Sequence, residues 1–243
     1  MKDRLRISAR SISRALQAHA SQERKKINEW FFKTEEGQYG AHDRFLGIKN
    51  SDVRLVAKEY DAIDLREVQK LLRSSYNEQR LCALIILVKK FKKASKKDLK
   101  KIYDLYMENI DYVNNWNLVD LSAPHILGEY IYNQKESKIL DQLCQSHSQW
   151  HRRICMIATW SFTKRNEYDS TLYFAEKLLT DQEDLMHKVV GWMLREVWKR
   201  DPVVCEKFIR TYYDAMSRTT LRYAIEKMPE KKRLLYLKKT FGH

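Results

Sequence analysis

The chain has 243 residues, with 46 Lys and Arg against 32 Asp and Glu, and a formal net charge of +14. Apolar residues make up 44% and aromatic residues 12%, which excludes a disordered basic tail. Gly and Pro number only 6 and 3. This excludes a collagen-like chain and argues against a many-stranded β fold, whose turns depend on these residues. We expect one all-α domain over residues 1–243 with a sizeable core.

The four cysteines, Cys82, Cys144, Cys155 and Cys205, form no CxxC pair and have no nearby His at metal-ligand spacing. A zinc site therefore has little support, and we expect no metal or cofactor. Free thiols favour a reducing, cytoplasmic location. No stretch approaches the ~20 apolar residues that span a membrane. Residues 2–14 are rich in Arg and Ser; a basic first helix explains them better than a transit peptide.

Apolar residues recur with helical spacing along the whole chain, and no segment shows sustained strict alternation. In chain order we expect helices over 3–19, 22–33, 51–60, 65–74, 77–93, 96–110, 115–132, 136–146, 150–164, 169–180, 184–200, 202–214, 217–227 and 230–240. Asn77, Asp201 and Ser217 are the expected N-caps, and Pro202 suits a first helical turn. Residues 34–49 hold three of the six glycines and form the one substantial loop.

Two apolar stripes are especially regular. They comprise Leu81, Leu84, Ile85, Val88 and Phe91, and then Val190, Met193, Leu194 and Val197. Each indicates a helix that is apolar on one side. A proline follows the expected helix start near residue 115, and we expect Pro124 to kink or interrupt that helix.

A weak internal repeat is also present. Helices that open with a polar or basic residue begin near Arg80, Asn117, Arg152, Val189 and Thr220, in steps of 37, 35, 37 and 31 residues. This is the length of a helix–turn–helix repeat, whose units bury their apolar faces by stacking into a solenoid. An irregular helical bundle is the alternative.

The positive charge indicates a polyanionic partner, since Lys and Arg on the concave face of a solenoid would follow phosphates. The densest basic run is Lys89–Lys101, with eight lysines and one acid, across a helix–loop–helix junction. We expect it at the edge of the surface that binds such a polyanion; a solvated helix end, with lysines near the negative end of the dipole, explains it equally well. Because basic residues occur throughout the chain, membrane binding is less favoured.

Three segments hold candidate site residues. In VNNWNLVD, Trp116 and Asp120 stand four residues apart and share one helix face, about 6 Å apart at Cβ; alone, such a pair is more often the edge of a core. In HKVVGWMLRE, Trp192 lies on the face that carries Lys188 and Arg195, and indole beside cations is typical of a nucleic-acid surface.

The third segment is WHRRICM, where two arginines open a helix. One of Arg152 and Arg153 could hold a phosphate. A structural arginine in a salt bridge is an equal alternative.

Taken together, WHRRICM, VNNWNLVD, KVVGWMLRE and GQYGAHDRFLGIKNSDVR, in their order and spacing, resemble the AlkD family of DNA alkylation repair glycosylases. YNEQRLCALIILVKKF resembles the third repeat of that family. The resemblance covers about residues 25–235 and leaves the first twenty residues unmatched. It implies HEAT-like repeats, about six helical pairs in a right-handed superhelix, with a basic concave face that binds duplex DNA.

The resemblance also implies an activity: excision of cationic alkylated bases such as 3-methyladenine and 7-methylguanine. Asp120 then matches the catalytic aspartate, and Trp116 and Trp192 match the two tryptophans of the site. Arg153 matches an arginine that approaches the DNA backbone near the lesion.

Two further matches of the resemblance imply DNA contacts. Arg54 matches a phosphate contact and Tyr39 an aromatic residue of the N-terminal loop. Asn117 stands where the family often has Asp, at a position that is not catalytic.

Two rival functions remain. One is a catalytically silent nucleic-acid-binding member of the same fold, against which the presence of Asp120 and both tryptophans argues. The other is a HEAT-type protein scaffold, which has no need for a strongly positive face. Binding to duplex DNA that falls steeply with salt would distinguish a DNA-binding protein from a scaffold. We expect a monomer.

Overall fold

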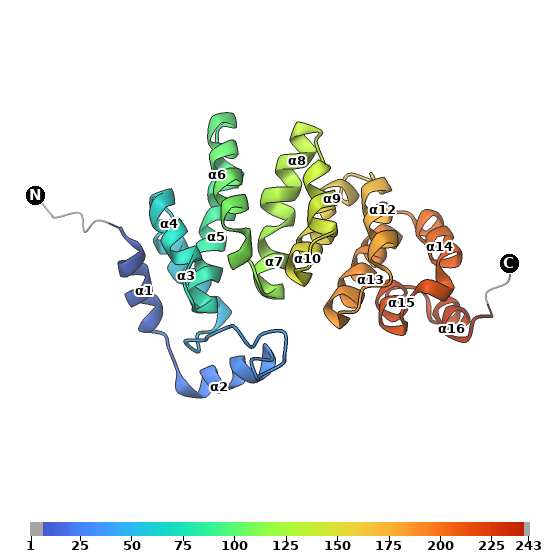
Figure 1. The fold of residues 1–243 in the computed structure, drawn as a ribbon, viewed down its shortest axis with the longest axis horizontal. Coiled ribbons are helices and arrows are strands. Elements are labelled where there is room, and N and C mark those ends of the chain that lie inside the picture. The colour runs from blue at the N-terminus through green and yellow to red at the C-terminus, as the bar shows by residue number, and fades with distance from the viewer. Residues whose placement is uncertain (1–6, 241–243) are drawn as a thin grey trace, which may run out of the picture. The chain divides into compact units, whose positions relative to one another are not determined.

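The computed structural model describes residues 7–240, whose regular secondary structure is entirely helical apart from an isolated β-bridge between Arg44 and Tyr76 (Figure 1). The helices are α1 (Ala9–Gln17), α2 (Gln22–Phe31), α3 (Asn50–Glu59), α4 (Leu65–Leu72), α5 (Asn77–Lys93), α6 (Lys96–Glu108), α7 (Trp116–Ser122), α8 (Glu129–Gln134), α9 (Lys138–Cys144), α10 (Gln149–Ala158), α11 (Trp160–Thr163), α12 (Asp169–Leu178), α13 (Asp184–Trp198), α14 (Pro202–Thr211), α15 (Arg218–Ala224) and α16 (Glu230–Lys238). The all-α prediction is therefore confirmed.

Most predicted helices are present with ends shifted by a few residues. The first helix begins at Ala9, because the Ser8 hydroxyl caps it by accepting the Ser11 N–H. Residues 3–6 of the predicted helix lie outside the described residues. Asp201 and Ser217 cap α14 and α15 as expected. The prediction for Asn77 is wrong: Tyr76 occupies the N-cap position of α5.

Pro124 interrupts the predicted helix 115–132, as expected. α7 ends at Ser122, and a π-helical turn over Pro124–Gly128 joins it to α8. Proline cannot donate a backbone hydrogen bond, so the regular ladder has to change at this point. Gly128 N–H instead donates to the Ala123 carbonyl over five residues. The interruption keeps α7 short and separates the Trp116–Asp120 pair from α8.

The predicted repeat has a physical signature in the turns before α5, α10 and α13. Each turn has the same two hydrogen bonds, counted from its first residue, n. The side chain of residue n accepts the backbone N–H of residue n+2 at 3.0–3.2 Å, and the backbone carbonyl of residue n accepts a hydrogen bond from the side chain of residue n+6 at 2.6–2.9 Å. The three sets are Ser74, Tyr76 and Arg80; Ser146, Ser148 and Arg152; Asp181, Glu183 and His187. Ser74 and Ser146 are 72 residues apart, which is the length of two repeats, and Ser146 and Asp181 are 35 residues apart, which is the length of one repeat.

Helices pack in successive pairs, and Cα packing divides the chain into two compact units, one ending at Tyr130 and one starting at Ile131. α4 packs on α5 in the first unit; α9 packs on α10, and α12 on α13, in the second. The second helices of neighbouring pairs also touch: α5 contacts α7, and α13 contacts both α10 and α15. Stacked pairs of this kind are the arrangement of a helical-repeat protein. The expectations of a single domain and of a right-handed superhelix stay predictions.

Two helices form the centres of the units. On α13, the predicted stripe is buried in full: Val190, Met193, Leu194 and Val197 are at most 1% exposed. On α5 four residues of the predicted stripe are buried, but Ile85 is only half-buried. Cys82, Ala83, Ile86 and Leu87, which lie outside the stripe, are fully buried, so the one-sided prediction is wrong for this helix. α5 contacts α3, α4, α6 and α7, and a helix surrounded in this way is apolar on most sides.

Candidate functional site

α7 begins at one candidate residue and carries the other one turn later. Asn115 is the N-cap, and its Oδ1 accepts the Trp116 N–H at 2.8 Å. Leu118, Val119 and Ser122 face the core and are fully buried. Trp116 and Asp120 are half-buried, so the predicted shared face is the partly solvent-exposed side of α7.

An aromatic cluster supports the Trp116 indole. Its ring stacks on Phe32, with centroids 5.1 Å apart and planes at 17°, and Phe31 meets it edge-on at 5.8 Å. Phe32 in turn stacks on Phe45 at 4.8 Å. One face of the indole is therefore covered by protein, and the Trp116 side chain as a whole is half-buried. Sequence reasoning missed these phenylalanines, although the run Trp30–Phe32 was a signal.

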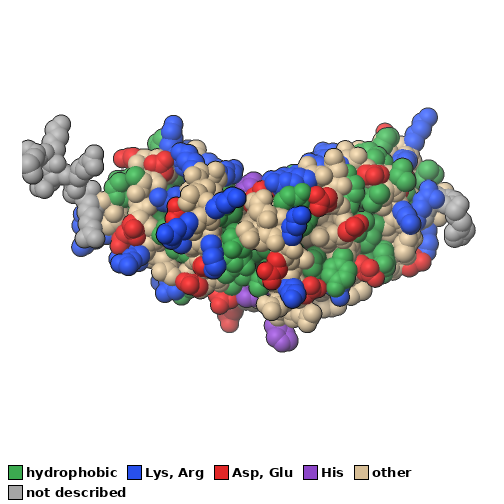
Figure 2. All heavy atoms as spheres, turned by 90° about the horizontal axis from the view of Figure 1, so that it is seen from above, with side chains coloured by type: hydrophobic (Ala, Val, Ile, Leu, Met, Phe, Trp, Pro, Cys, Tyr) green, Lys and Arg blue, Asp and Glu red, His purple; other side chains and the backbone are tan. Residues whose placement is uncertain are grey.

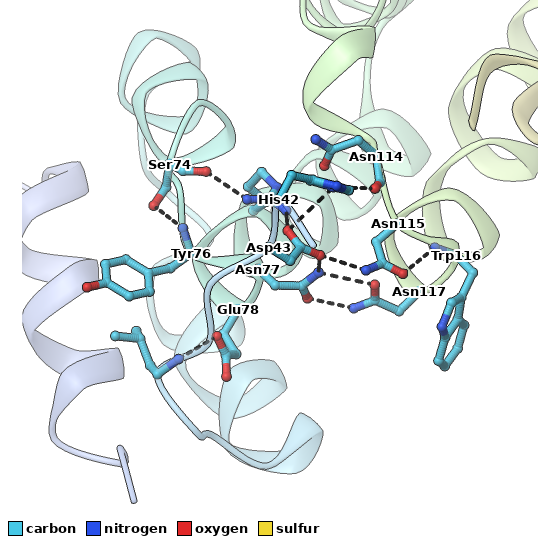
Figure 3. A network of polar contacts seen from close by, with 12 residues as sticks. His42, Asp43, Ser74, Tyr76, Asn77, Glu78, Asn114, Asn115, Trp116 and Asn117 are labelled. Atoms are coloured by element: carbon cyan, nitrogen blue, oxygen red, sulfur yellow. Dashed lines mark hydrogen bonds and ion pairs between the residues drawn. The ribbon is translucent and has the colours of Figure 1, made fainter. Parts of the chain in front are cut away.

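A buried carboxylate fixes the start of α7 to the rest of the first unit (Figure 3). Asp43, with its side chain inaccessible to solvent, accepts hydrogen bonds from Asn115 Nδ2 at 2.6 Å and Asn77 Nδ2 at 2.8 Å. It also forms an ion pair with Arg80. Asn117 Nδ2 donates to Asn77 Oδ1 at 2.8 Å. Asn117 is thus part of the support for α7.

This network explains the failed capping prediction. The Asn77 side chain points to Asp43 and Asn117 and does not turn back to cap α5. A buried carboxylate is costly unless charge and hydrogen bonds compensate it, and Asp43 receives both. Only the fold brings the 34–49 loop, α5 and α7 together, so the sequence held no local signal for this network.

A second buried carboxylate, Glu78, holds the end of the loop. Its oxygens accept the N–H groups of Leu46, Gly47 and Ile48 at 2.9–3.2 Å and the Asn28 side chain at 3.2 Å. Gly47 has φ +83°, and a Cβ there would lie 2.1 Å from the Ser21 carbonyl oxygen. Glycine is therefore required at this position. The result is a firm junction between α2, the loop and α5.

In the second unit, the cations around the half-buried Trp192 are ion-paired. Lys188 Nζ lies 2.6 Å from Asp184, and Arg195 pairs with Glu226. A hydrogen bond from Lys227 and the charge of Arg195 lower the pKa of the Glu226 carboxyl. Figure 2 shows one face of the protein, where Lys and Arg are likewise interspersed with Asp and Glu. A DNA phosphate that met Lys188 or Arg195 would have to compete with these carboxylates.

The two arginines of α10 have different surroundings. Arg152 forms an ion pair with Asp181, with Nε 2.6 Å from the carboxylate, and also donates to the Ser146 and His147 carbonyls. For Arg152, the structural alternative is therefore confirmed. Arg153 is 5% exposed, and its Nη1 donates to the Leu185 carbonyl at 2.8 Å. This bond joins α10 to α13, the helix that carries Trp192.

Two remaining candidates lie in the first unit. Arg54 is exposed on α3, and Tyr39 is half-buried in the 34–49 loop. The structure thus brings together Trp116 with Asp120, and Arg153 with the helix of Lys188, Trp192 and Arg195. Convergence of these two groups stays a prediction.

The basic run Lys89–Lys101 crosses the α5–α6 junction as predicted. Three of its lysines have acidic partners: Lys89 with Asp61, Lys100 with Asp104 and Lys101 with Asp98. The hydrogen bond and charge of Lys89, together with the charges of neighbouring lysines, lower the pKa of Asp61. The remaining five are Lys90, which is half-buried, and Lys92, Lys93, Lys96 and Lys97, which are exposed.

Comparison with known proteins then identifies the family. The sequence profile of the DNA alkylation repair enzyme family matches residues 12–228. The chain belongs to this family. A solved structure described as a predicted DNA alkylation repair enzyme from Enterococcus faecalis shares the fold, with a TM-score of 0.69 and 15% identity over 87% of this chain and 98% of that one. No curated protein matches the chain.

Membership of the DNA alkylation repair enzyme family connects the fold to alkylation damage in DNA. Among the described residues, no helix combines the length and apolar character needed to cross a membrane, and no three His, Cys, Asp or Glu side chains gather as they would around a metal ion.

Proposed function

We propose that this protein is a monofunctional DNA glycosylase that hydrolyses the N-glycosidic bond of cationic N3- and N7-alkylated purines, including 3-methyladenine and 7-methylguanine, in duplex DNA. The observation that carries the proposal is the pairing of Asp120 with Trp116 on the partly exposed side of α7, held by the buried Asp43 network. A carboxylate and an indole in one fixed arrangement suit a reaction that develops positive charge.

The proposed hydrolysis requires few protein groups other than the Asp120 carboxylate and the Trp116 indole. Alkylation makes the purine cationic and weakens its glycosidic bond, so the base departs as a neutral molecule without protonation by a general acid. The sugar acquires oxocarbenium character in the transition state. The Asp120 carboxylate stabilises that charge and orients or deprotonates the attacking water, whose oxygen bonds to C1′ while the base leaves.

The tryptophans have a supporting part. Trp116 and Trp192 contact the deoxyribose and stabilise its positive charge by cation–π interaction, about 1–2 kcal/mol each when water is excluded. Because Phe32 covers one face of Trp116, the sugar meets the opposite face.

The other candidates contact DNA away from the reacting atoms. Arg54, Tyr39, Lys188 and Arg195 bind the DNA backbone around the lesion. Arg153 approaches the DNA backbone nearest the lesion, while its hydrogen bond to the Leu185 carbonyl holds α10 against α13, the helix of Trp192. Neither a metal nor a cofactor takes part, and the protein acts as a cytoplasmic monomer.

The decisive experiment is a base-release assay. The protein is incubated with methylated duplex DNA, and free 3-methyladenine and 7-methylguanine are separated and quantified, with undamaged duplex as control. Release above the spontaneous rate supports the glycosylase. Tight, salt-sensitive DNA binding without release would instead support the alternative, a non-catalytic nucleic-acid-binding HEAT-like repeat protein.

A further inference from the structure

α2 presents an exposed apolar face. Ile27, Trp30 and Phe31 are 43%, 71% and 52% exposed, and their spacing of three and four residues places them on one side of the helix. Asn28 is the one residue of α2 that is buried. Trp30 is far more accessible than the half-buried Trp116 and Trp192 of the predicted site. Such exposure of large apolar side chains marks a contact surface.

This face is firmly mounted. The Asn28 side chain donates to the buried Glu78, whose oxygens also bind the N–H groups of residues 46–48. Ser21 N–H, just before α2, donates to the Gly47 carbonyl at 3.1 Å. α2 is thus tied to the loop just before its first residue and to Glu78 of α5 at Asn28. A rigidly presented aromatic residue loses little conformational entropy when it binds a partner.

The surroundings of Trp30 are polar and suit a nucleobase. The Lys33 ammonium lies 5.4 Å from the centre of the Trp30 ring. An open cavity of about 390 Å³ adjoins the ring and is lined by Lys26, Lys33, Glu35 and Gln38, among others. An indole offers a stacking platform, lysines bind phosphate, and carboxylate and amide groups match the donors and acceptors on the edge of a base.

The face is also continuous with the α7 site. Phe31, which is exposed beside Trp30, contacts the Trp116 ring edge-on with centroids 5.8 Å apart. Phe31 therefore links the Trp116 ring to the exposed side of α2. A nucleotide next to one that meets Trp116 can reach this surface.

We propose that Trp30 and Phe31, with the cavity beside them, form a second binding site that stacks an unpaired nucleotide of the DNA substrate. This inference rests on the proposed function for its DNA partner. The Trp30 site would contact a base that has left the duplex. The chemistry proposed for Asp120 and Trp116 does not require such a contact. Its consequence is a preference for DNA with a locally opened helix.

The test uses two fluorescently labelled duplexes, one fully paired and one with three unpaired thymidines, and measures their dissociation constants by anisotropy. The wild-type protein should bind the opened duplex more tightly. Trp30→Ala should weaken binding to the opened duplex by roughly 5- to 160-fold, the value of one base–aromatic stack. Binding to the paired duplex should change less than twofold. Trp30→Phe should restore most of the affinity for the opened duplex.

Leu55→Ala is the matched control, since Leu55 is 59% exposed on α3 and loses an apolar side chain without an aromatic ring. An equal loss on both duplexes, no loss on either, or a concentration-dependent dimer in the wild type that Trp30→Ala abolishes would overturn the proposal. Base release from methylated duplex is measured in parallel. If the protein prefers the opened duplex but releases no bases, only the glycosylase proposal is contradicted. If it releases bases but shows no preference for the opened duplex, only the proposed Trp30 site is contradicted.

Discussion

Asn115 and Asp43 are 72 residues apart in the chain and 2.6 Å apart in the structure. Asn115 uses its oxygen to cap α7 and its amide nitrogen to bind the buried Asp43 carboxylate. The helix that carries Trp116 and Asp120 is therefore fixed at its first turn to a loop and, through Asp43, to Arg80 of α5.

We expect Asn115→Ala to lower the free energy of unfolding by about 2–4 kcal/mol. The substitution removes a helix cap and one donor to a buried charge. Urea unfolding followed by circular dichroism measures the loss. Ser95→Ala is the control, because Ser95 caps α6 at an exposed position and should cost only about 1 kcal/mol. Equal losses in the two variants would mean that the Asp43 hydrogen bond adds nothing.

Asp120→Asn should reduce excision of methylated purines by roughly ten- to a thousandfold, because it keeps the shape of the side chain and removes the charge that stabilises the sugar cation. Single-turnover base release measures the effect. DNA binding should persist or tighten, since a negative charge near phosphates is removed. Asp169→Asn, an exposed change of equal charge on α12, should excise normally. Near wild-type excision by folded Asp120→Asn protein contradicts the mechanism.

Trp192→Ala should lower excision by about 5- to 30-fold, the equivalent of the 1–2 kcal/mol expected of one cation–π contact. Trp116→Ala should lower excision and stability together, because Phe32 loses its stacking partner. Thermal melts of both variants separate the two effects. If Trp192→Ala excises as fast as the wild type, Trp192 has no part in stabilising the sugar.

Charge reversal at Lys92 and Lys97, which are exposed in the basic run, should weaken duplex binding whatever the DNA sequence. It should also reduce the slope of log affinity against log salt by about 0.9 for each phosphate that the protein no longer neutralises. Lys207→Glu with Lys231→Glu makes the same charge change at exposed positions on α14 and α16. Should both double variants behave alike, the run acts only through net charge and is a solvated helix end.

The cysteines should differ in reactivity. All four are free and buried, but a hydrogen bond from Cys155 lowers the pKa of Cys144, whereas burial raises the pKa of Cys82 to about 12. The thiolate is the reactive form, and its fraction rises as pH approaches the pKa. Iodoacetamide should therefore modify Cys144 first as pH increases, as measured by peptide mass spectrometry. Earlier modification of Cys82 would contradict this order, and Cys144→Ser should remove the first phase.

The sequence by itself determined the helical class and nearly every helix. Apolar spacing, capping residues such as Asp201 and Ser217, and Pro124 act within one or two helical turns, so their effect can be read locally. The repeat was visible because similar helix starts recur in steps of 31 to 37 residues. The turn shared before α5, α10 and α13 was found only in the structure. Trp116 and Asp120 shared a helix face by spacing alone.

Tertiary structure decided what surrounds those residues. It turned Asn77 from an expected cap into a partner of Asp43, placed Phe32 on one face of Trp116, and left Trp30 in solvent. Each of these outcomes depends on segments that are distant in the chain and meet only after folding. A buried charge such as Asp43 selects its partners by proximity and desolvation, neither of which a local pattern encodes.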